Sequence, residues 1–112
     1  MVAAGMSVNI AGPNGRRTIA VEDVTVAPGR TSLGKGEFVV SFNLPARPER
    51  GGDAYLRLIP RTEMDIAVVG CGVALTLDSD GVVKTAKVSL GAVAATVLIV
   101  EDAAKAIIGT KL

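Results

Sequence analysis

Short stretches in which apolar and polar residues alternate constrain the fold of this chain more than any other feature. The clearest stretch spans residues 37–44, where every second side chain from Phe38 to Leu44 is apolar. A period of two is that of a β-strand, in which successive side chains point to opposite faces of a sheet. Pro45 ends the stretch, because proline has no N–H to donate to a strand ladder. The pattern therefore predicts a strand over residues 37–44.

The first third of the chain shows the same pattern at smaller scale. Residues 7–10 and 16–21 alternate, and Pro13–Gly15 between them contains residues that favour turns, so we expect a β-hairpin. Residues 27–36 are rich in Pro and Gly and predict a loop. Residues 45–52 are polar and again rich in Pro and Gly. They are the best candidate for a boundary between two structural units.

The second half predicts three further strands. Residues 55–59 alternate. Asp78–Gly81 is typical of a hairpin turn, and residues 82–90 are the expected return strand, with Lys84 and Lys87 at solvated positions. Residues 66–77 are rich in β-branched side chains and almost uncharged, which is typical of a strand covered on both faces. Residues 93–100 fit either a strand or a loop.

One helix is predicted near the end of the sequence. Residues 101–108 begin with two acidic side chains, carry an apolar stripe and are followed by Gly109, which can cap the helix. Several strands with little helix predict an α+β fold built on antiparallel sheets, in two unequal parts.

The residues that the chain lacks limit its chemistry. It has no His and one Cys, which excludes imidazole catalysis, a Ser-His-Asp triad, an internal disulfide and thiolate metal clusters. The net charge is +1 and three residues are aromatic, Phe38, Phe42 and Tyr55, so binding to nucleic acid or a membrane surface is not predicted. Residues 88–100, the longest nearly apolar run, are fewer than the roughly 20 that a membrane span needs. Without a signal-peptide pattern, and with a lone Cys, we expect a cytoplasmic protein.

Three small motifs have structural interpretations. Gly70 and Gly72 follow an apolar stretch, as in a dinucleotide-binding turn, but a third glycine and a helix are missing, so we interpret them as a bend or bulge. Cys71 has no neighbouring base or cation and is interpreted as a buried structural thiol. Asp78 and Asp80 lack the further oxygen ligands of a calcium loop and are assigned to the hairpin turn.

Two arginines near one turn allow two interpretations. Arg57 and Arg61 lie close in sequence to Asp65, and arginine pairs with a carboxylate or with the acceptor atoms of a cofactor. The simpler interpretation is a local Arg61–Asp65 ion pair across the turn. Reasoning from the residues alone predicts no catalytic group and no metal ligand.

The order of these segments resembles one known family, the flavoprotein (medium, FAD-binding) subunit of the molybdenum hydroxylases, of the carbon monoxide dehydrogenase and xanthine dehydrogenase type. The short segment Asn14–Ile19 is similar to the strand pair that closes the FAD-binding domain of that subunit. The other segments that carry the resemblance are, in order, Thr31–Leu33, Gly36–Val40, Leu44–Pro45, Tyr55–Leu58, Arg61 with Asp65–Ala67, Leu77–Gly81, Leu90–Gly91 and Ile108–Gly109.

The resemblance implies a fold and a division into domains. It implies an antiparallel sheet of three to four strands with helices on one face, preceded by β-strands from the end of an FAD-binding domain. Residues 1–46 would be the end of that FAD-binding domain. Residues 47–112 would be the flavoprotein C-terminal domain, truncated before its last helices.

The resemblance also implies an electron-transfer function. FAD would pass electrons from [2Fe–2S] clusters to an external acceptor, with molybdopterin on a large partner subunit and the clusters on a small iron–sulfur subunit. The Gly-rich segments that bind most of the FAD in this family have no match here. In such a chain the cofactor supplies the chemistry and the protein supplies position and electrostatics.

Two residues correspond to family positions near the flavin. Val39 matches an apolar residue that packs near the isoalloxazine ring, and Arg57 matches a basic residue that approaches the flavin from the C-terminal domain. A cation at that position would favour a reduced, anionic flavin. The alternative function is a non-enzymatic protein-interaction module, which docks a partner through an exposed sheet edge.

Overall fold

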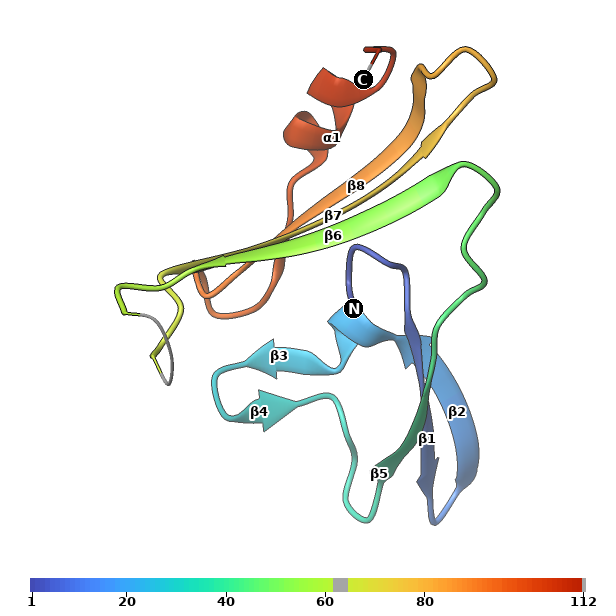
Figure 1. Cartoon of the computed structure of the whole chain (residues 1–112). Coiled ribbons are helices and arrows are strands. Elements are labelled where there is room, and N and C mark those ends of the chain that lie inside the picture. The colour runs from blue at the N-terminus through green and yellow to red at the C-terminus, as the bar shows by residue number, and fades with distance from the viewer. Residues whose placement is uncertain (62–64, 112) are drawn as a thin grey trace.

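The alternating stretches form two separate antiparallel sheets in the computed structural model, which describes residues 1–61 and 65–111 (Figure 1). The N-terminal sheet has the strand order β2-β1-β5, with a small β3-β4 ladder beside it, and the C-terminal sheet has the order β6-β7-β8-β9. We call residues 1–43 the N-terminal unit, residues 44–50 the linker and residues 51–111 the C-terminal unit. The elements are β1 (Ser7–Gly12), β2 (Gly15–Ala20), the 3₁₀ helix η1 (Val21–Asp23), β3 (Thr25–Ala27), β4 (Arg30–Thr31), β5 (Phe38–Asn43), β6 (Gly51–Leu58), β7 (Val69–Leu77), β8 (Val83–Gly91), β9 (Leu98–Ile99) and α1 (Glu101–Ile107).

The predicted N-terminal hairpin is confirmed. β1 and β2 pair in register from Ser7 opposite Ala20 to Gly12 opposite Gly15. The tight turn is closed by Gly15, whose φ of 108° is a conformation that side chains rarely adopt. β1 is the central strand, so its backbone is paired on both edges.

β5 forms where the sequence predicts it, but a bulge interrupts its alternation. Val39 lies opposite Ile10, whereas Ser41 lies opposite Asn9, so Val40 has no partner in the ladder. The extra residue breaks the simple two-face pattern of the predicted strand. Val39 packs against the core of the N-terminal unit, while Phe38 and the other alternate apolar side chains of the strand are exposed.

The core of the N-terminal unit is small. Val8 and Ile10, both 0% exposed, project from the central strand and pack with Val2 and Val21. Half-buried apolar side chains surround this cluster: Met6, Ile19, Val24, Leu33 and Val39.

The loop predicted over residues 27–36 contains a short ladder that the sequence analysis missed. β3 and β4 pair through Thr25 opposite Thr31 and Ala27 opposite Arg30. The turn between them uses Gly29, with a φ of 67°. The Pro-Gly pair that predicted a loop is therefore the turn of a hairpin too short to show an alternating pattern.

The C-terminal sheet forms from the predicted strands with shifted bounds. β6 begins at Gly51, four residues before the predicted start. The additional residues, 51–54, pair with residues 73–76 of β7. The predicted turn at Asp78 is confirmed, since its carboxylate accepts hydrogen bonds from the backbone N–H groups of Asp80 and Val82, both at 2.9 Å.

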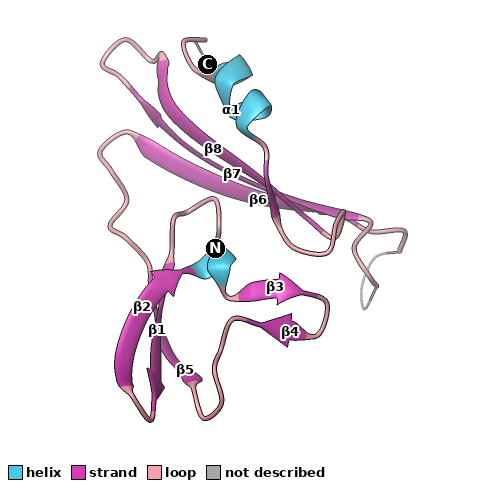
Figure 2. Cartoon of the chain, turned by 180° about the vertical axis from the view of Figure 1, so that it is seen from behind, coloured by secondary structure: helices cyan, strands magenta, loops and turns pink. Residues whose placement is uncertain are grey.

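The burial predicted for residues 66–77 is wrong. Only Gly70 of β7 is buried, and the rest of the strand, including Cys71, is half-buried. The reason is the position of the helix: α1 lies against β8, on the sheet face away from the N-terminal unit, as Figures 1 and 2 show from opposite sides. Val83, Val88 and Ala104 form the small buried contact beneath it.

The predicted helix is confirmed, whereas Gly109 does not cap it through its backbone, because its N–H donates to the carbonyl of Val83 in β8 at 2.8 Å. α1 covers Glu101–Ile107, and Gly109 follows with a φ of 85°, the left-handed conformation typical of a helix C-terminus. Residues 93–100 are mostly loop and contribute only the two-residue strand β9. Among the described residues no helix is both long and apolar enough to span a membrane.

Gly70 and Gly72 make space for a side chain and do not mark a bend or bulge. β7 pairs without interruption with β6 from Val69 to Thr76, so the expected bend is absent from that ladder. A Cβ on Gly70 would overlap the ring of Tyr55, and a Cβ on Gly72 would lie 3.0 Å from the Ser89 hydroxyl. The missing side chains therefore form a shallow trough that holds the tyrosine ring.

We predict that Gly70→Ala displaces this ring. The added methyl overlaps the Tyr55 side chain, so the ring moves and the free energy of unfolding falls by about 1 kcal/mol or more. Tyr55 is the only tyrosine and there is no Trp, so tyrosine fluorescence reports on this side chain alone. Gly52→Ala is the control, because a Cβ there has open space. Identical fluorescence and stability in the two variants would contradict the trough.

Candidate functional site

The candidate site lies on the face of the C-terminal sheet that looks toward the N-terminal unit. We call this the inner face. Tyr55 and Arg57 of β6 share it with Gly70 and Gly72 of β7, which lie opposite them in the ladder. A Cβ on Gly72 would lie 3.4 Å from the side chain of Ala3, so the N-terminal segment covers part of this face.

Arg57 is exposed near the end of β6. It pairs through its backbone with Gly70, so no neighbouring side chain on β7 covers it. It forms no ion pair with any residue that the structure describes. A guanidinium donates to carboxylates and to the acceptor atoms of a cofactor.

The Arg61–Asp65 ion pair that the sequence predicts is present after β6. Nε of Arg61 donates to Oδ2 of Asp65 at 3.1 Å and Nη2 donates to Oδ1 at 3.2 Å. The backbone N–H groups of Arg61 and Ile66 also donate to this carboxylate. The Arg61 guanidinium lowers the pKa of Asp65, and the charge of Arg57 contributes to the same shift. Arg61 is thus occupied locally, whereas Arg57 forms no ion pair with residues 1–61 or 65–111.

Val39 lies in the other sheet. Its half-buried side chain packs on the cluster that contains Ile10 and Val21. Val39 lies in β5 of the N-terminal unit and Arg57 lies in β6 of the C-terminal unit. A ligand that contacted both residues would therefore lie between the two units.

Hydrogen bonds to the carboxylate of Glu37 fix the start of β5 and with it the position of Val39. Arg17 donates to both carboxylate oxygens of Glu37 at 2.8 Å, and the backbone N–H of Gly34 donates to Oε2 at 2.6 Å. These interactions, the Arg17 hydrogen bond first, lower the pKa of Glu37 to about 2. Arg17 also donates to the carbonyl of Ser32, which ties the loop before β5 to β2.

Tyr55 belongs to the inner face and was missed in the sequence analysis. It is 66% exposed, and it lies two residues before Arg57, on the same side of β6. A signal was present in the sequence, since the only tyrosine of the chain precedes the arginine and two glycines occur in the next strand. The alternation of β6 indicates which of its residues share a face, but the purpose of the opposing glycines is visible only once the register is known.

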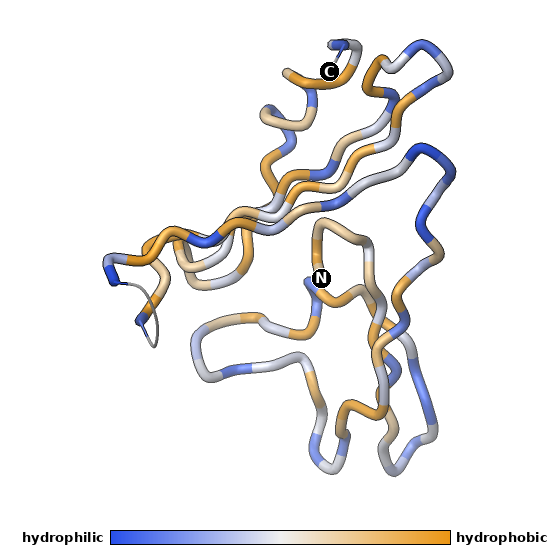
Figure 3. The backbone as a smooth tube through the Cα atoms, viewed as in Figure 1, coloured by the Kyte–Doolittle hydropathy of each residue, from blue (hydrophilic) through white to orange (hydrophobic). Residues whose placement is uncertain are grey.

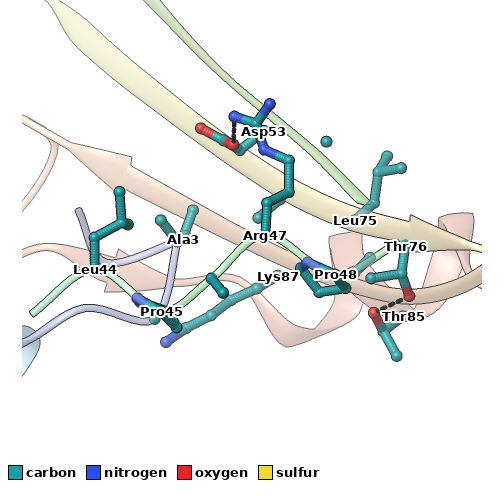
Figure 4. A pocket seen from close by; sticks show the side chains of 16 residues that line it. Ala3, Leu44, Pro45, Arg47, Pro48, Asp53, Leu75, Thr76, Thr85 and Lys87 are labelled. Atoms are coloured by element: carbon teal, nitrogen blue, oxygen red, sulfur yellow. Dashed lines mark hydrogen bonds and ion pairs between the residues drawn. The ribbon is translucent and has the colours of Figure 1, made fainter. Parts of the chain in front are cut away.

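A cleft of about 560 Å³ lies between the N-terminal segment, the linker and the C-terminal sheet (Figure 4). Arg47 donates to Asp53, and the hydroxyls of Thr76 and Thr85 hydrogen-bond to each other at 2.6 Å. Both pairs line the cleft, so its polar groups are largely satisfied within the protein. Among the described residues no group of three or more acidic or Cys side chains is arranged to hold a metal ion.

Comparison with known proteins gives matches over the whole chain. Residues 54–112 match the family model of the CO dehydrogenase flavoprotein C-terminal domain. The chain is 34% identical over 112 residues to the carbon monoxide dehydrogenase medium chain of Afipia carboxidovorans, covering 100% of this chain and 38% of that protein. It is 33% identical over 73 residues to a putative xanthine dehydrogenase FAD-binding subunit of Escherichia coli, covering 64% of this chain and 25% of that protein.

The fold has a close match among solved structures. A chain of carbon monoxide dehydrogenase from Hydrogenophaga pseudoflava, in a form that lacks the Mo-pyranopterin moiety of the molybdenum cofactor, superimposes with a TM-score of 0.88 at 32% identity. The match covers 99% of this chain and 38% of that chain. The present chain therefore spans about two fifths of the length of these two carbon monoxide dehydrogenase chains.

We predict that Glu37→Gln lowers stability in a pH-dependent way. Because the folded-state pKa of Glu37, about 2, is below its ordinary value of 4.5, its charge stabilises the fold fully above pH 4.5, and this contribution is lost as the pH falls toward 2. Thermal unfolding should show a midpoint several degrees lower than wild type at pH 7, with the difference shrinking between pH 4.5 and 2. Glu49→Gln, in the exposed linker, is the control. A difference independent of pH would contradict the assignment.

Proposed function

The chain belongs to the CO dehydrogenase flavoprotein C-terminal domain family, and we propose that it supports the isoalloxazine end of FAD in the medium subunit of a molybdenum hydroxylase. The resemblance found in the sequence is thereby confirmed at the level of the family. The cofactor, the electron transfer and the assembly belong to the proposal. In it, residues 1–46 are the end of an FAD-binding domain and residues 47–112 are a flavoprotein C-terminal domain.

The observation that supports the cofactor assignment is an exposed aromatic ring beside a cation that forms no ion pair within the described part of the chain. Tyr55 and Arg57 lie two residues apart on the inner face, opposite Gly72 and Gly70 of β7, which have no side chains of their own to cover them. An aromatic ring and a guanidinium fit a flat, electron-accepting heterocycle such as isoalloxazine. These residues do not fit a pyrophosphate, which needs a cradle of backbone N–H groups at a helix N-terminus.

Bound FAD would supply the electron-accepting and electron-donating chemistry. Within this chain, Arg57 would favour negative charge on the ring system by placing a fixed positive charge beside it. Val39 would exclude water from the opposite side. Glu37 and Arg17 would hold Val39 in place, because they fix the loop that enters β5.

The partners we propose are a molybdopterin-binding large subunit and a small subunit with [2Fe–2S] clusters, in a cytoplasmic complex. The second relevant observation is the apolar surface of the C-terminal unit, where hydrophobic residues recur along the strands and α1 (Figure 3). Leu56 and Leu58 of β6 are 77% and 62% exposed. Such a surface is typical of a protein contact.

The same observation favours the second candidate function, a protein-interaction module without a cofactor role. The two candidates differ in a single measurement. A full-length subunit that contains this chain should be isolated with the absorbance of FAD under the first proposal. A folded subunit without flavin absorbance favours the interaction module.

We predict that Arg57→Ala in the full subunit lowers the reduction potential of the flavin. Loss of a nearby positive charge makes the reduced, anionic form less stable by about 1.4 kcal/mol, equivalent to about 30 mV for a two-electron couple. Arg57→Lys keeps the charge and should keep most of the potential. Lys84→Ala, an exposed cation of β8, is the control. Equal potentials for Arg57→Ala and wild type, measured by dye-coupled titration, would remove Arg57 from the site.

A further inference from the structure

One ion pair joins the two units. Lys87 of β8 donates from Nζ to Oε1 of Glu22 in η1 at 2.8 Å, across 65 positions of sequence. Among the residues that the structure describes, it is the only hydrogen bond or ion pair that directly links the N-terminal and C-terminal units. The other direct approach is apolar, through the N-terminal residues Met1–Ala4 against the inner face.

The pair is shielded from solvent more than the ion pair on α1, and about as well as Arg17–Glu37, whose side chains are 39% and 21% exposed. The side chains of Lys87 and Glu22 are 32% and 23% exposed, compared with 71% and 97% for Lys105 and Asp102 on α1. The second carboxylate oxygen of Glu22 is buried without a hydrogen-bond partner. Burial raises the pKa of Glu22 and the bond from Lys87 lowers it, with a net shift downward, so the ionised form is retained.

Each member of the pair is rigidly connected to one half of the proposed flavin site. Glu22 follows Val21, which belongs to the buried cluster on which Val39 packs. Lys87 pairs with Ala74 of β7, and β7 pairs with β6, which carries Arg57. The pair therefore connects the N-terminal sheet, which carries Val39, to the C-terminal sheet, which carries Arg57. We call these two sheets the walls of the proposed site.

The linker does not fix the angle between these walls. Arg47 bonds to Asp53, and the carbonyls of Pro48 and Arg50 accept backbone hydrogen bonds from Gly51 and Leu77, so residues 47–50 are tied to the C-terminal unit. Pro45 and Ala46 lie outside any strand, between β5 and these ties. Rotation about this short segment is opposed chiefly by the apolar N-terminal contact and by the Glu22–Lys87 pair.

We propose that Glu22 and Lys87 are positioning residues that set the angle between the two sheets and thereby the spacing between Val39 and Arg57. This inference rests on the proposed function for its consequence, which is that the pair tunes the width of the flavin site. Glu22 and Lys87 act through the two walls and contact no cofactor.

The first test measures the angle in this chain without any cofactor. Spin labels are placed at Arg16→Cys on β2 and Lys84→Cys on β8, both exposed, in a Cys71→Ser background. Pulsed electron–electron double resonance should give a narrow distribution of distances between the two labels. Glu22→Gln and Lys87→Met should each broaden or shift this distribution. The reversed pair, Glu22→Lys with Lys87→Glu, should restore it. Lys105→Met, which breaks an ion pair inside one unit, should not change it.

Unchanged distances in Glu22→Gln and Lys87→Met would overturn the inference, whatever cofactor the subunit holds. Folding of each variant is checked by the tyrosine fluorescence of Tyr55, and the reversed pair separates a lost contact from general destabilisation.

The second test uses the full subunit. Glu22→Gln and Lys87→Met should raise the dissociation constant for FAD several-fold and shift its absorption spectrum, and the reversed pair should reduce both effects. Broadened distances with unchanged FAD affinity and spectrum would overturn the positioning role. A wild-type subunit that binds no FAD would overturn the proposed function instead, while the distance measurement would still decide whether the pair fixes the angle.

Discussion

Burial of Val8 and Ile10 on the central strand β1 is the contact on which the N-terminal unit depends. Both side chains are fully buried, and β1 is paired on both edges, so the strand cannot shift register without exposing them. Val21 joins the same cluster and starts the 3₁₀ helix that presents Glu22, and Val39 packs on it from β5. One small core therefore places both a proposed flavin contact and the residue that reaches the other sheet.

The C-terminal sheet follows a different principle, because its two faces have opposite character. Small residues on the inner face, Gly70, Gly72 and Ala74, leave room for Tyr55, for the Ser89 hydroxyl and for the Lys87 stem. On the outer face α1 covers β8, while the leucines of β6 remain exposed. A sheet with one open, lightly filled face and one apolar face is suited to lie between a ligand and further protein.

The sequence predicted the features that depend on residues close together in the chain. The turns at Gly15 and Asp78–Gly81, and the end of α1 before Gly109, need particular backbone conformations, so their residue types reveal them. The bulge at Val40 and the purpose of Gly70 depend on partners far along the chain. Periodicity cannot reveal either, because the pattern within one strand holds no information about its neighbour. The β3-β4 ladder was missed for another reason, since strands of two and three residues are too short to show a period.

The ion pairs of the described residues divide in the same way, and this division bears on the site. Three of the five join residues at most six positions apart, Arg47–Asp53, Arg61–Asp65 and Lys105–Asp102, and they stabilise a linker, a turn and a helix. The other two span 20 and 65 positions: Arg17–Glu37 fixes the entry to β5, and Lys87–Glu22 joins the units. The three local pairs stabilise conformations that the backbone of the same segment already favours. The long-range pairs instead set relations that no local preference determines, and both act on the walls that carry Val39 and Arg57. Among the described residues, one of these two long-range pairs acts within the N-terminal sheet and only Lys87–Glu22 acts between the sheets, so their relative placement depends on a single charged contact.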